Sequence, residues 1–341
     1  MPQVQTGRIT GPQAWIGRDI EDTTSWVVHL DETALAEIHD SVVAAEARGL
    51  EIPFPAEAFP LDHTRKLIDG IPVALEDGLG FLLVRGIDRS RYSVSQCELI
   101  YWGIGVHLGR PISQNTRGHL LGHVRDEGRS FDDPNARGYQ TSAKMDFHAD
   151  QLPVDVLGLF CLRAAKTGGS SALISVGAVH NALADEHPDL LEVLYQPFNL
   201  DWRGEEPPGE RPWYTSPMFS SHDGKVTSRI TSRQYFETVT RFGAELGLTD
   251  IQREALDVVQ RIANRPEMRL SMMMKEGDMQ FLNNHAILHA REAFTDHDEP
   301  DMKRHLLRMW IALDADHRRR LAPELAERYR WVEAGGIRAR D

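Results

Sequence analysis

Apolar residues recur every three or four positions in several stretches of the chain, which is the spacing of one face of a helix. The first stretch follows Asp31, a residue that can cap a helix, and it predicts a helix over residues 32–48. Capping boxes mark where two other helices begin, because their side chains satisfy the first backbone N–H groups. These helices are predicted after Ser95-Gln96-Cys97-Glu98 and Thr249-Asp250-Ile251-Gln252, and two short helices are predicted over residues 176–194, broken at Pro188.

Other stretches are short and almost continuously apolar, as is typical of strands buried on both faces. Residues 80–84 and 154–162 fit this description. The runs 268–274 and 279–283 flank a Lys-Glu-Gly-Asp turn, and this pattern predicts strand, tight turn, strand. Residues 304–313 predict a further strand.

Two stretches show no apolar periodicity. Residues 110–137 are rich in Gly, Asn, Asp and Arg and predict a long loop, and loops of that length often serve a function. Residues 203–217 are dense in Pro, Gly and charge and predict an excursion over the surface. Since strands lie on both sides of a mostly helical middle, we expect one α+β domain over residues 1–341, with a mostly helical insertion at about 176–265.

Composition narrows the function classes. The 341 residues are 41% hydrophobic and 26% charged, as in an ordinary globular protein, and carry a net charge of −13. That charge argues against nucleic acid or an anionic membrane surface as a partner. No apolar run approaches the roughly 18 residues of a spanning helix, and only two cysteines are present, so a reducing cytoplasm is the expected location. The partners expected are a small-molecule substrate and, at most, further copies of the chain in a homo-oligomer.

A metal site is the strongest chemical signal in the sequence. His148 and Asp150 lie two residues apart just before an apolar strand, and in an extended chain such side chains share a face. A second cluster, residues 280–291, supplies His285 and His289. Two histidines and one carboxylate form the facial triad of non-haem Fe(II) oxygenases. The alternatives are buried core histidines, or a helical metal pair that lacks the Glu of a His-Glu-x-x-His zinc protease.

Two arginines lie within the last predicted strand. Arg304 and Arg308 fall on one face of the otherwise apolar run Arg304-His-Leu-Leu-Arg308-Met-Trp310. Buried guanidinium groups need anionic partners. The partners are either Asp or Glu side chains at a sheet edge, or a dicarboxylate ligand gripped by the guanidinium forks.

Taken together, these motifs resemble the taurine dioxygenase-like (TauD/TfdA) branch of the Fe(II)/2-oxoglutarate dioxygenases. The resemblance covers residues 80–313 and rests on the order of His148-x-Asp150, a Gly-Gly-Ser-Ser turn at 168–171, Asn284 with His289 five residues on, and the two arginines. It implies a double-stranded β-helix, or jelly roll, that holds Fe(II) through His148, Asp150 and His289. It further implies that Ser171 and Arg304 bind the far carboxylate of 2-oxoglutarate and that Arg308 lies nearer the metal.

Two spacings depart from the family pattern. The gap from Asp150 to Ser171 is shorter than usual, which leaves Ser170 and Ser175 as alternatives to Ser171. The gap from His289 to Arg304 is longer than usual, so the roles of Arg304 and Arg308 could be exchanged.

The activity implied is oxidation of a small organic substrate by O2 and 2-oxoglutarate, with release of succinate and CO2. Because halogenating relatives lack the carboxylate, Asp150 favours hydroxylation or desaturation over chlorination. A non-catalytic jelly-roll module that binds a metal or small acid, and a zinc hydrolase with the same ligands, are the alternatives. Candidates to line the substrate pocket are Ser113, Gln114, Asn115 and Gln140, although each could equally stabilise a loop.

Overall fold

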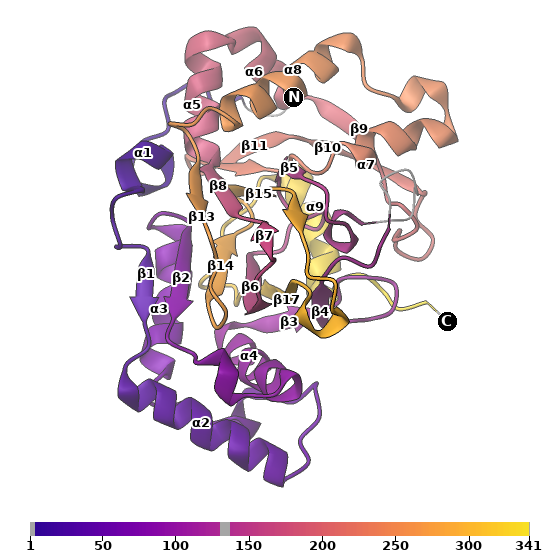
Figure 1. Cartoon of the computed structure of the whole chain (residues 1–341). Helices are drawn as coiled ribbons and strands as arrows, with labels where there is room; N and C mark the ends of the chain where they lie inside the picture. The colour runs from indigo at the N-terminus through magenta and orange to yellow at the C-terminus, as the bar shows by residue number, and fades with distance from the viewer. Residues whose placement is uncertain (1–3, 130–136, 341) are drawn as a thin grey trace.

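Two facing β-sheets form the centre of the structure, a computed structural model that describes residues 4–129 and 137–340 (Figure 1). The larger sheet has the order β1-β2-β14-β6-β17-β3, with β4 also paired to β17. Its strands are β1 Val27–His29, β2 Phe81–Arg85, β3 Arg110–Ile112, β4 Leu121–Val124, β6 Val156–Arg163, β14 Met279–Asn283 and β17 His305–Ala312. The smaller sheet, in the order β13-β8-β15-β5, consists of β5 Met145–His148, β8 Ser171–Ser175, β13 Leu270–Met272 and β15 Ile287–Arg291.

From β5 onward the chain passes repeatedly between the two sheets. Strand β5 lies in the smaller sheet, β6 in the larger and β8 in the smaller, and β13, β14, β15 and β17 alternate in the same way. The pairs within this set are antiparallel. Such alternation is that of a double-stranded β-helix, so the expected α+β class with a jelly-roll core is confirmed.

The period of two along each strand decides which side chains face the space between the sheets. On β17, Leu307 and Met309 join the apolar cluster on the outer face of the larger sheet. Their neighbours Arg308 and Trp310 therefore face inward, where both line a cavity between the sheets. Gln280 on β14 also lines an inward-facing cavity.

Helices cover the outer face of each sheet (Figure 1). Three helices pack their apolar side chains on the larger sheet: α2 Glu32–Ala47, α3 Arg65–Glu76 and α4 Val94–Leu108. The smaller sheet is covered by α5 Val176–Glu186, α6 Pro188–Leu194 and α8 Asp250–Ala263. The remaining α-helices in the described ranges are α1 Gly17–Ile20, α7 Gln234–Glu237 and α9 Pro323–Glu333.

The region 176–265 contains helices and two hairpins. Strand β9 Pro197–Asp201 pairs with β10 Trp213–Pro217, and β11 Phe219–His222 pairs with β12 Lys225–Ser228. A further pair, β7 Thr167–Gly168 with β16 Phe294–Thr295, lies beside the smaller sheet.

The predicted helices at 32–48, 176–194 and after Thr249 are confirmed, but the capping box at Ser95 is wrong. The box is formed two residues earlier. Ser93 accepts a hydrogen bond from the Gln96 backbone N–H at 3.1 Å, and the Gln96 side chain accepts one from the Ser93 N–H at 2.8 Å. Both boxes fit the sequence pattern, and the earlier one makes the helix two residues longer.

The strands on either side of the Lys-Glu-Gly-Asp turn do not pair with each other. Strand β13 joins the smaller sheet, whereas β14 lies between β2 and β6 in the larger sheet. Because both edges of β14 already have partners, the turn carries the chain from one sheet to the other.

Two segments predicted to be irregular contain strands or buried residues. Strands β3 and β4 interrupt the expected loop at 110–137, because β17 would otherwise present unpaired backbone groups at that edge. The expected surface excursion at 203–217 is wrong for Arg203 and Glu205, which are 4% and 9% exposed.

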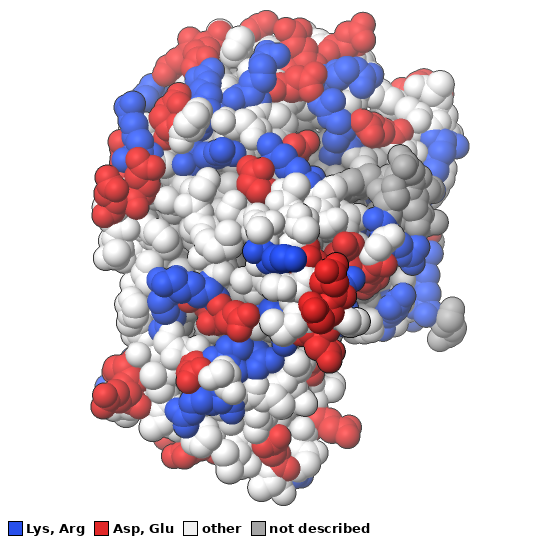
Figure 2. All heavy atoms as spheres, in the orientation of Figure 1, with Lys and Arg blue, Asp and Glu red and all other residues white. Residues whose placement is uncertain are grey.

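The surface carries both signs of charge. Figure 2 shows acidic and basic side chains interspersed over one face, so the net charge of −13 does not gather there into one acidic patch. Within the described ranges, no helix is both long and apolar enough to cross a membrane.

Two glycines test how tightly the helices pack on the larger sheet. A Cβ added to Gly158 in β6 would lie 2.4 Å from the buried Tyr101 hydroxyl of α4, so Gly158→Ala must displace the Tyr101 side chain or the helix that carries it. We expect a loss of about 1–3 kcal/mol in the free energy of unfolding, measured by urea denaturation. Gly70→Ala in α3 is the matched control: a Cβ there meets nothing within 4 Å, and we expect a gain of about 0.5–1 kcal/mol. Equal stability of the two variants would contradict this packing.

Candidate metal centre

Two histidines face each other across the smaller sheet. His148 ends β5 and is the cross-strand partner of His289 on β15, with ring centroids 4.2 Å apart. Both side chains are largely buried, at 9% and 15% exposure. The strand pairing therefore brings together two imidazoles from residues that are 141 positions apart in sequence.

Asp150 completes the group from the turn after β5. Its Oδ2 accepts a hydrogen bond from Trp310 Nε1 and lies 3.4 Å from an Arg308 nitrogen. Its Oδ1 is left facing the histidines, 3.9 Å from His148 Nε2 and 3.7 Å from His289 Nε2. Among the described residues, His148, Asp150 and His289 form the one group of three whose ligand atoms lie within 4.8 Å of one another.

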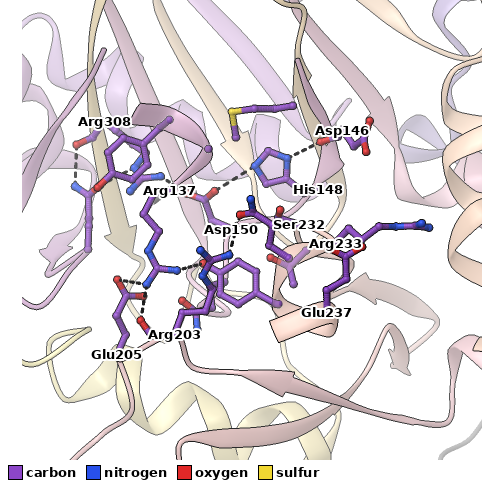
Figure 3. A pocket seen from close by; sticks show the side chains of 18 of the residues that line it. Arg137, Asp146, His148, Asp150, Arg203, Glu205, Ser232, Arg233, Glu237 and Arg308 are labelled. Atoms are coloured by element: carbon purple, nitrogen blue, oxygen red, sulfur yellow. Dashed lines mark hydrogen bonds and ion pairs between the residues drawn. The ribbon is translucent and has the colours of Figure 1, made fainter. Parts of the chain in front are cut away.

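The protonation states suit a cation. His148 Nδ1 donates to the Asp146 carbonyl at 2.7 Å, which leaves Nε2 free to accept a metal (Figure 3). Burial lowers the pKa of His148, and burial together with the neighbouring His148 lowers the pKa of His289 to about 3. Burial opposes ionisation of Asp150, but the charge of Arg308 and the hydrogen bond from Trp310 hold its pKa below the ordinary value. At neutral pH the group therefore offers two neutral imidazoles and a carboxylate, a donor set that fits Fe(II) and leaves open positions.

Two buried side chains, Asn284 and Arg229, hold the backbone from Asp150 to Leu152 in place. Asn284 accepts from the Asp150 N–H at 2.8 Å and donates to the Leu152 carbonyl at 3.1 Å. Arg229, 2% exposed, donates to the carbonyls of Asp150, Gln151 and Leu152. Burial lowers the pKa of Arg229 to about 9, which still leaves it charged at neutral pH. Together these bonds fix the direction in which the Asp150 carboxylate points.

A small cavity beside the triad is lined by buried arginines. Arg304 is 5% exposed and its NH1 lacks a hydrogen-bond partner, as do Nε and NH1 of Arg291, which is 6% exposed. Ser171 is the cross-strand partner of Arg291 and lines the same cavity. Buried guanidinium N–H groups without acceptors are costly, so this cavity fits an anion with several oxygens, such as a dicarboxylate.

The structure places the residues between which the spacing left a choice in different surroundings. His285 lies 3.3 Å from Asp155, outside the triad. Of the three serines, Ser171 lines the cavity, whereas Ser175 caps α5 through the Ala178 N–H. Ser170 is not among the described lining residues.

A larger cavity of about 440 Å³ opens from the triad toward the solvent (Figure 3). Gln114 lines it and accepts from Arg308 Nε at 2.7 Å. The other three candidates for the substrate pocket lie elsewhere. Asn115 and Gln140 line a neighbouring cavity, and Ser113 lines a third one beside Trp331.

Several lining residues had no role assigned from the sequence. Trp310 and Arg291 each lie two positions beyond an assigned residue, Arg308 or His289, and period-two spacing on a strand could have found them. Arg137, Arg203 and Glu205 also line the larger cavity. The last two come from the predicted surface excursion, and no sequence signal linked them to the triad.

Comparisons with known proteins agree on one family. Residues 46–310 match the family described as taurine catabolism dioxygenase TauD, TfdA family. FR-33289 synthase of Streptomyces rubellomurinus is 33% identical, covering 97% of each chain, and the taurine hydroxylase-like protein SAT17 of Stachybotrys chartarum is 29% identical, covering 94% of this chain and 84% of its own. A solved asparagine oxygenase in complex with Fe(II), 3-hydroxyasparagine and succinate has a TM-score of 0.63 at 16% identity, covering 84% of this chain and 93% of its own.

Asn284 offers a test of how the carboxylate is positioned. Asn284→Ala removes both hydrogen bonds to the Asp150–Leu152 backbone, and we expect the affinity for Co(II) to fall about 10–100-fold, as for other residues that orient ligands. Calorimetric titration of the metal-free protein measures this. The matched control is the adjacent Asn283→Ala, whose side chain bonds Leu75, Glu76 and the His285 backbone N–H but not the Asp150 turn, and it should leave the affinity for Co(II) unchanged. Equal losses in both variants would mean that Asn284 acts only through stability.

Proposed function

The chain belongs to the TauD, TfdA family of Fe(II)- and 2-oxoglutarate-dependent dioxygenases, and we propose that His148, Asp150 and His289 hold the iron with which it oxidises a small organic substrate. The observation that carries this proposal is the convergence of Asp150 Oδ1 and the two Nε2 atoms in a buried group beside a cavity of unpartnered guanidinium N–H groups. Bound Fe(II) supplies the activation of O2 that couples conversion of 2-oxoglutarate into succinate and CO2 to hydroxylation or desaturation of the substrate.

We propose that the small cavity is the 2-oxoglutarate site. Arg304 and Ser171 would bind the far carboxylate, since they lie in the cavity that the triad also lines. Arg291 is well placed to add a second guanidinium, because its ring contact with Phe294 places it beside Arg304, which contacts the same ring. Arg308, 3.4 Å from Asp150, lies nearer the metal group and would face the other end of the cosubstrate.

Arg308 and Tyr139 would also orient the substrate and limit the access of water to the metal group. Arg308 is held between Gln114 and the face of the Tyr139 ring, with its guanidinium carbon 4.8 Å from the ring centroid. Tyr139 lines both the small and the larger cavity, and so forms part of the wall between cosubstrate and substrate. Such fixed side chains reduce the reorganisation needed when the substrate binds.

The comparisons support a small charged substrate. One relative is named as taurine hydroxylase-like, and one neighbouring structure holds hydroxyasparagine. Taurine and asparagine are small molecules with an ionised acid group. We infer a substrate of comparable kind for the cavity of about 440 Å³.

The choice of distal histidine gives a direct test. His289→Ala removes one of the three ligands, and we expect it to abolish the succinate formed from 2-oxoglutarate in the absence of substrate, measured with added Fe(II) and O2. His285→Gln is the control, because His285 lies in a separate pair with Asp155, and we expect it to retain this turnover. Turnover that survives in His289→Ala and is lost in His285→Gln would move the ligand to His285.

Two other function classes would give different results in the same assay. A binding module would take up iron without ever releasing succinate, and a zinc hydrolase would bind zinc tightly and show no dependence on 2-oxoglutarate. Addition of 2-oxoglutarate to the anaerobic Fe(II) protein should also produce a visible absorption band, which a zinc hydrolase would not show.

Removal of either buried arginine tests the cosubstrate site. We expect Arg304→Met to weaken 2-oxoglutarate binding at least about 100-fold and Arg291→Met about tenfold, because each loses charge-assisted hydrogen bonds in a buried cavity. Calorimetry with Mn(II) in place of iron measures the affinity without turnover. Arg269→Met, whose side chain pairs with Glu292 at 3.2 Å, is the control and should bind 2-oxoglutarate as the unmodified chain does. Unchanged affinity in Arg304→Met would place the far carboxylate elsewhere.

A further inference from the structure

The last helix of the chain lies beyond the part that matches the family. The match covers residues 46–310, whereas α9, drawn in yellow in Figure 1, spans Pro323–Glu333. Two polar side chains of α9 are nevertheless buried: Arg328 is 8% exposed and Tyr329 is 4% exposed. A buried guanidinium or phenol group needs hydrogen-bond partners, and both side chains donate to the segment that joins β5 to β6.

The segment between β5 and β6 depends on side chains for its conformation. Residues 149–155 lie in neither a helix nor a strand, so no ladder of backbone hydrogen bonds holds them. Asp150, near the start of the segment, is the proposed metal ligand, and Asp155 at its end is 3% exposed. The direction of the Asp150 carboxylate therefore depends on groups that bind this segment from outside.

Arg328 binds the start of the segment. Its NH2 donates to the Gln151 carbonyl at 3.3 Å, and the same carbonyl accepts from Arg229 at 2.9 Å. The guanidinium carbon of Arg328 lies 3.9 Å from the centroid of the Tyr214 ring. Because a guanidinium group stacks on an aromatic face, this contact limits the directions in which Arg328 can donate.

Tyr329 binds the end of the segment. Its hydroxyl donates to Asp155 Oδ2, which also accepts from the Leu313 N–H at 2.9 Å. The Asp155 carbonyl in turn accepts from the backbone N–H of Asn284 at 3.1 Å. Since the Asn284 side chain accepts from the Asp150 N–H at 2.8 Å, these bonds form a continuous path from α9 to the metal group.

We propose that Arg328 and Tyr329 are positioning residues of the metal group, and that they direct Asp150 Oδ1 toward the two histidines by fixing the segment between β5 and β6. This inference rests on the proposed function, in which Asp150 is a metal ligand, and it extends the site to a helix outside residues 46–310. Neither side chain is among the described residues that line the two cavities at the triad, so both act through the segment that they hold.

A purely structural role of α9 is the alternative. The helix also buries Leu325 and Val332, both 0% exposed, and so covers apolar surface. Loss of that cover would destabilise the fold without changing the groups that hold Asp150. The affinity of the folded protein for a metal separates the two roles, because the direction of a ligand changes this affinity and apolar cover alone does not.

Tyr329→Phe and Arg328→Met remove the two donors and keep most of the volume of each side chain. We expect each to lower the affinity of the metal-free full chain for Co(II) about tenfold, as for residues that orient metal ligands. Calorimetric titration measures the affinity. The visible absorption of bound Co(II), which depends on the geometry of its ligands, should shift as well. Unchanged affinity and an unchanged spectrum in either variant would overturn the role of that residue.

Leu325→Ala is the matched control on the same helix. It removes apolar cover but no donor to the segment, so we expect a lower thermal midpoint. Its affinity for Co(II) and its spectrum, measured well below that midpoint, should equal those of the unmodified chain. A loss of affinity equal to that in Tyr329→Phe would mean that α9 acts through stability alone, and would overturn the proposal.

A double variant tests the path from Tyr329 through Asn284. If the two residues act along one path, the affinity lost when Tyr329→Phe is combined with Asn284→Ala is smaller than the product of the two single losses, because members of one network are not independent. Single losses that multiply in the double variant would overturn this path.

Succinate formation by the unmodified chain with Fe(II), O2 and 2-oxoglutarate separates this inference from the proposed function. If succinate forms and the two variants bind Co(II) as the unmodified chain does, the positioning role is wrong and the dioxygenase function stands. If no succinate forms and the two variants bind Co(II) less tightly, the positioning role stands and the dioxygenase function is wrong.

Discussion

The Asp150 carboxylate joins the two sheets, and the geometry of the centre depends on it. One oxygen is held by Trp310 and Arg308 from the larger sheet, and the other faces the two histidines of the smaller sheet. A buried carboxylate is costly unless its oxygens are paired. Because the cationic and hydrogen-bonding partners come from one sheet and the two histidines from the other, these contacts fix the distance between the sheets at this point.

The region between β8 and β13 contributes to the site because it supplies Arg229, which holds the backbone of the Asp150 turn. Arg229, which follows β12 in that region, donates hydrogen bonds to three successive carbonyls of the Asp150 turn. Asn284, which follows β14, accepts a hydrogen bond from the Asp150 N–H of the same turn. A buried charged guanidinium is tolerated here because carbonyl oxygens accept hydrogen bonds from its two terminal nitrogens. The same region supplies Arg203 and Glu205 to the cavity wall, so it both holds the ligand turn and shapes the space in front of it.

Local patterns in the sequence predicted what depends on local physics. The apolar runs predicted β6 and β17, and the spacing of apolar residues predicted α2 and α8. The His-x-Asp pair was predicted from the period of two of an extended chain, although Asp150 lies in the turn just after β5. Features set by distant partners escaped prediction. Strands β3 and β4 exist because β17 has an edge to cover, β13 and β14 separate because β14 already has two partners, and Glu205 is buried because Arg137 reaches it. The capping box predicted at Ser95 to Glu98 was wrong because an equally good capping pattern begins two residues earlier.

The buried arginines also connect ligand binding to stability. Arg291 and Arg304 have buried N–H groups without acceptors, and each such group costs about 1–3 kcal/mol relative to a satisfied one. That cost is borne by the folded chain alone, and an anion that supplies the missing acceptors removes it. A ligand that binds only the folded state stabilises it by RT ln(1 + [L]/Kd). An anion that binds in the cavity beside the triad would therefore gain affinity from hydrogen bonds to these donors as well as from charge.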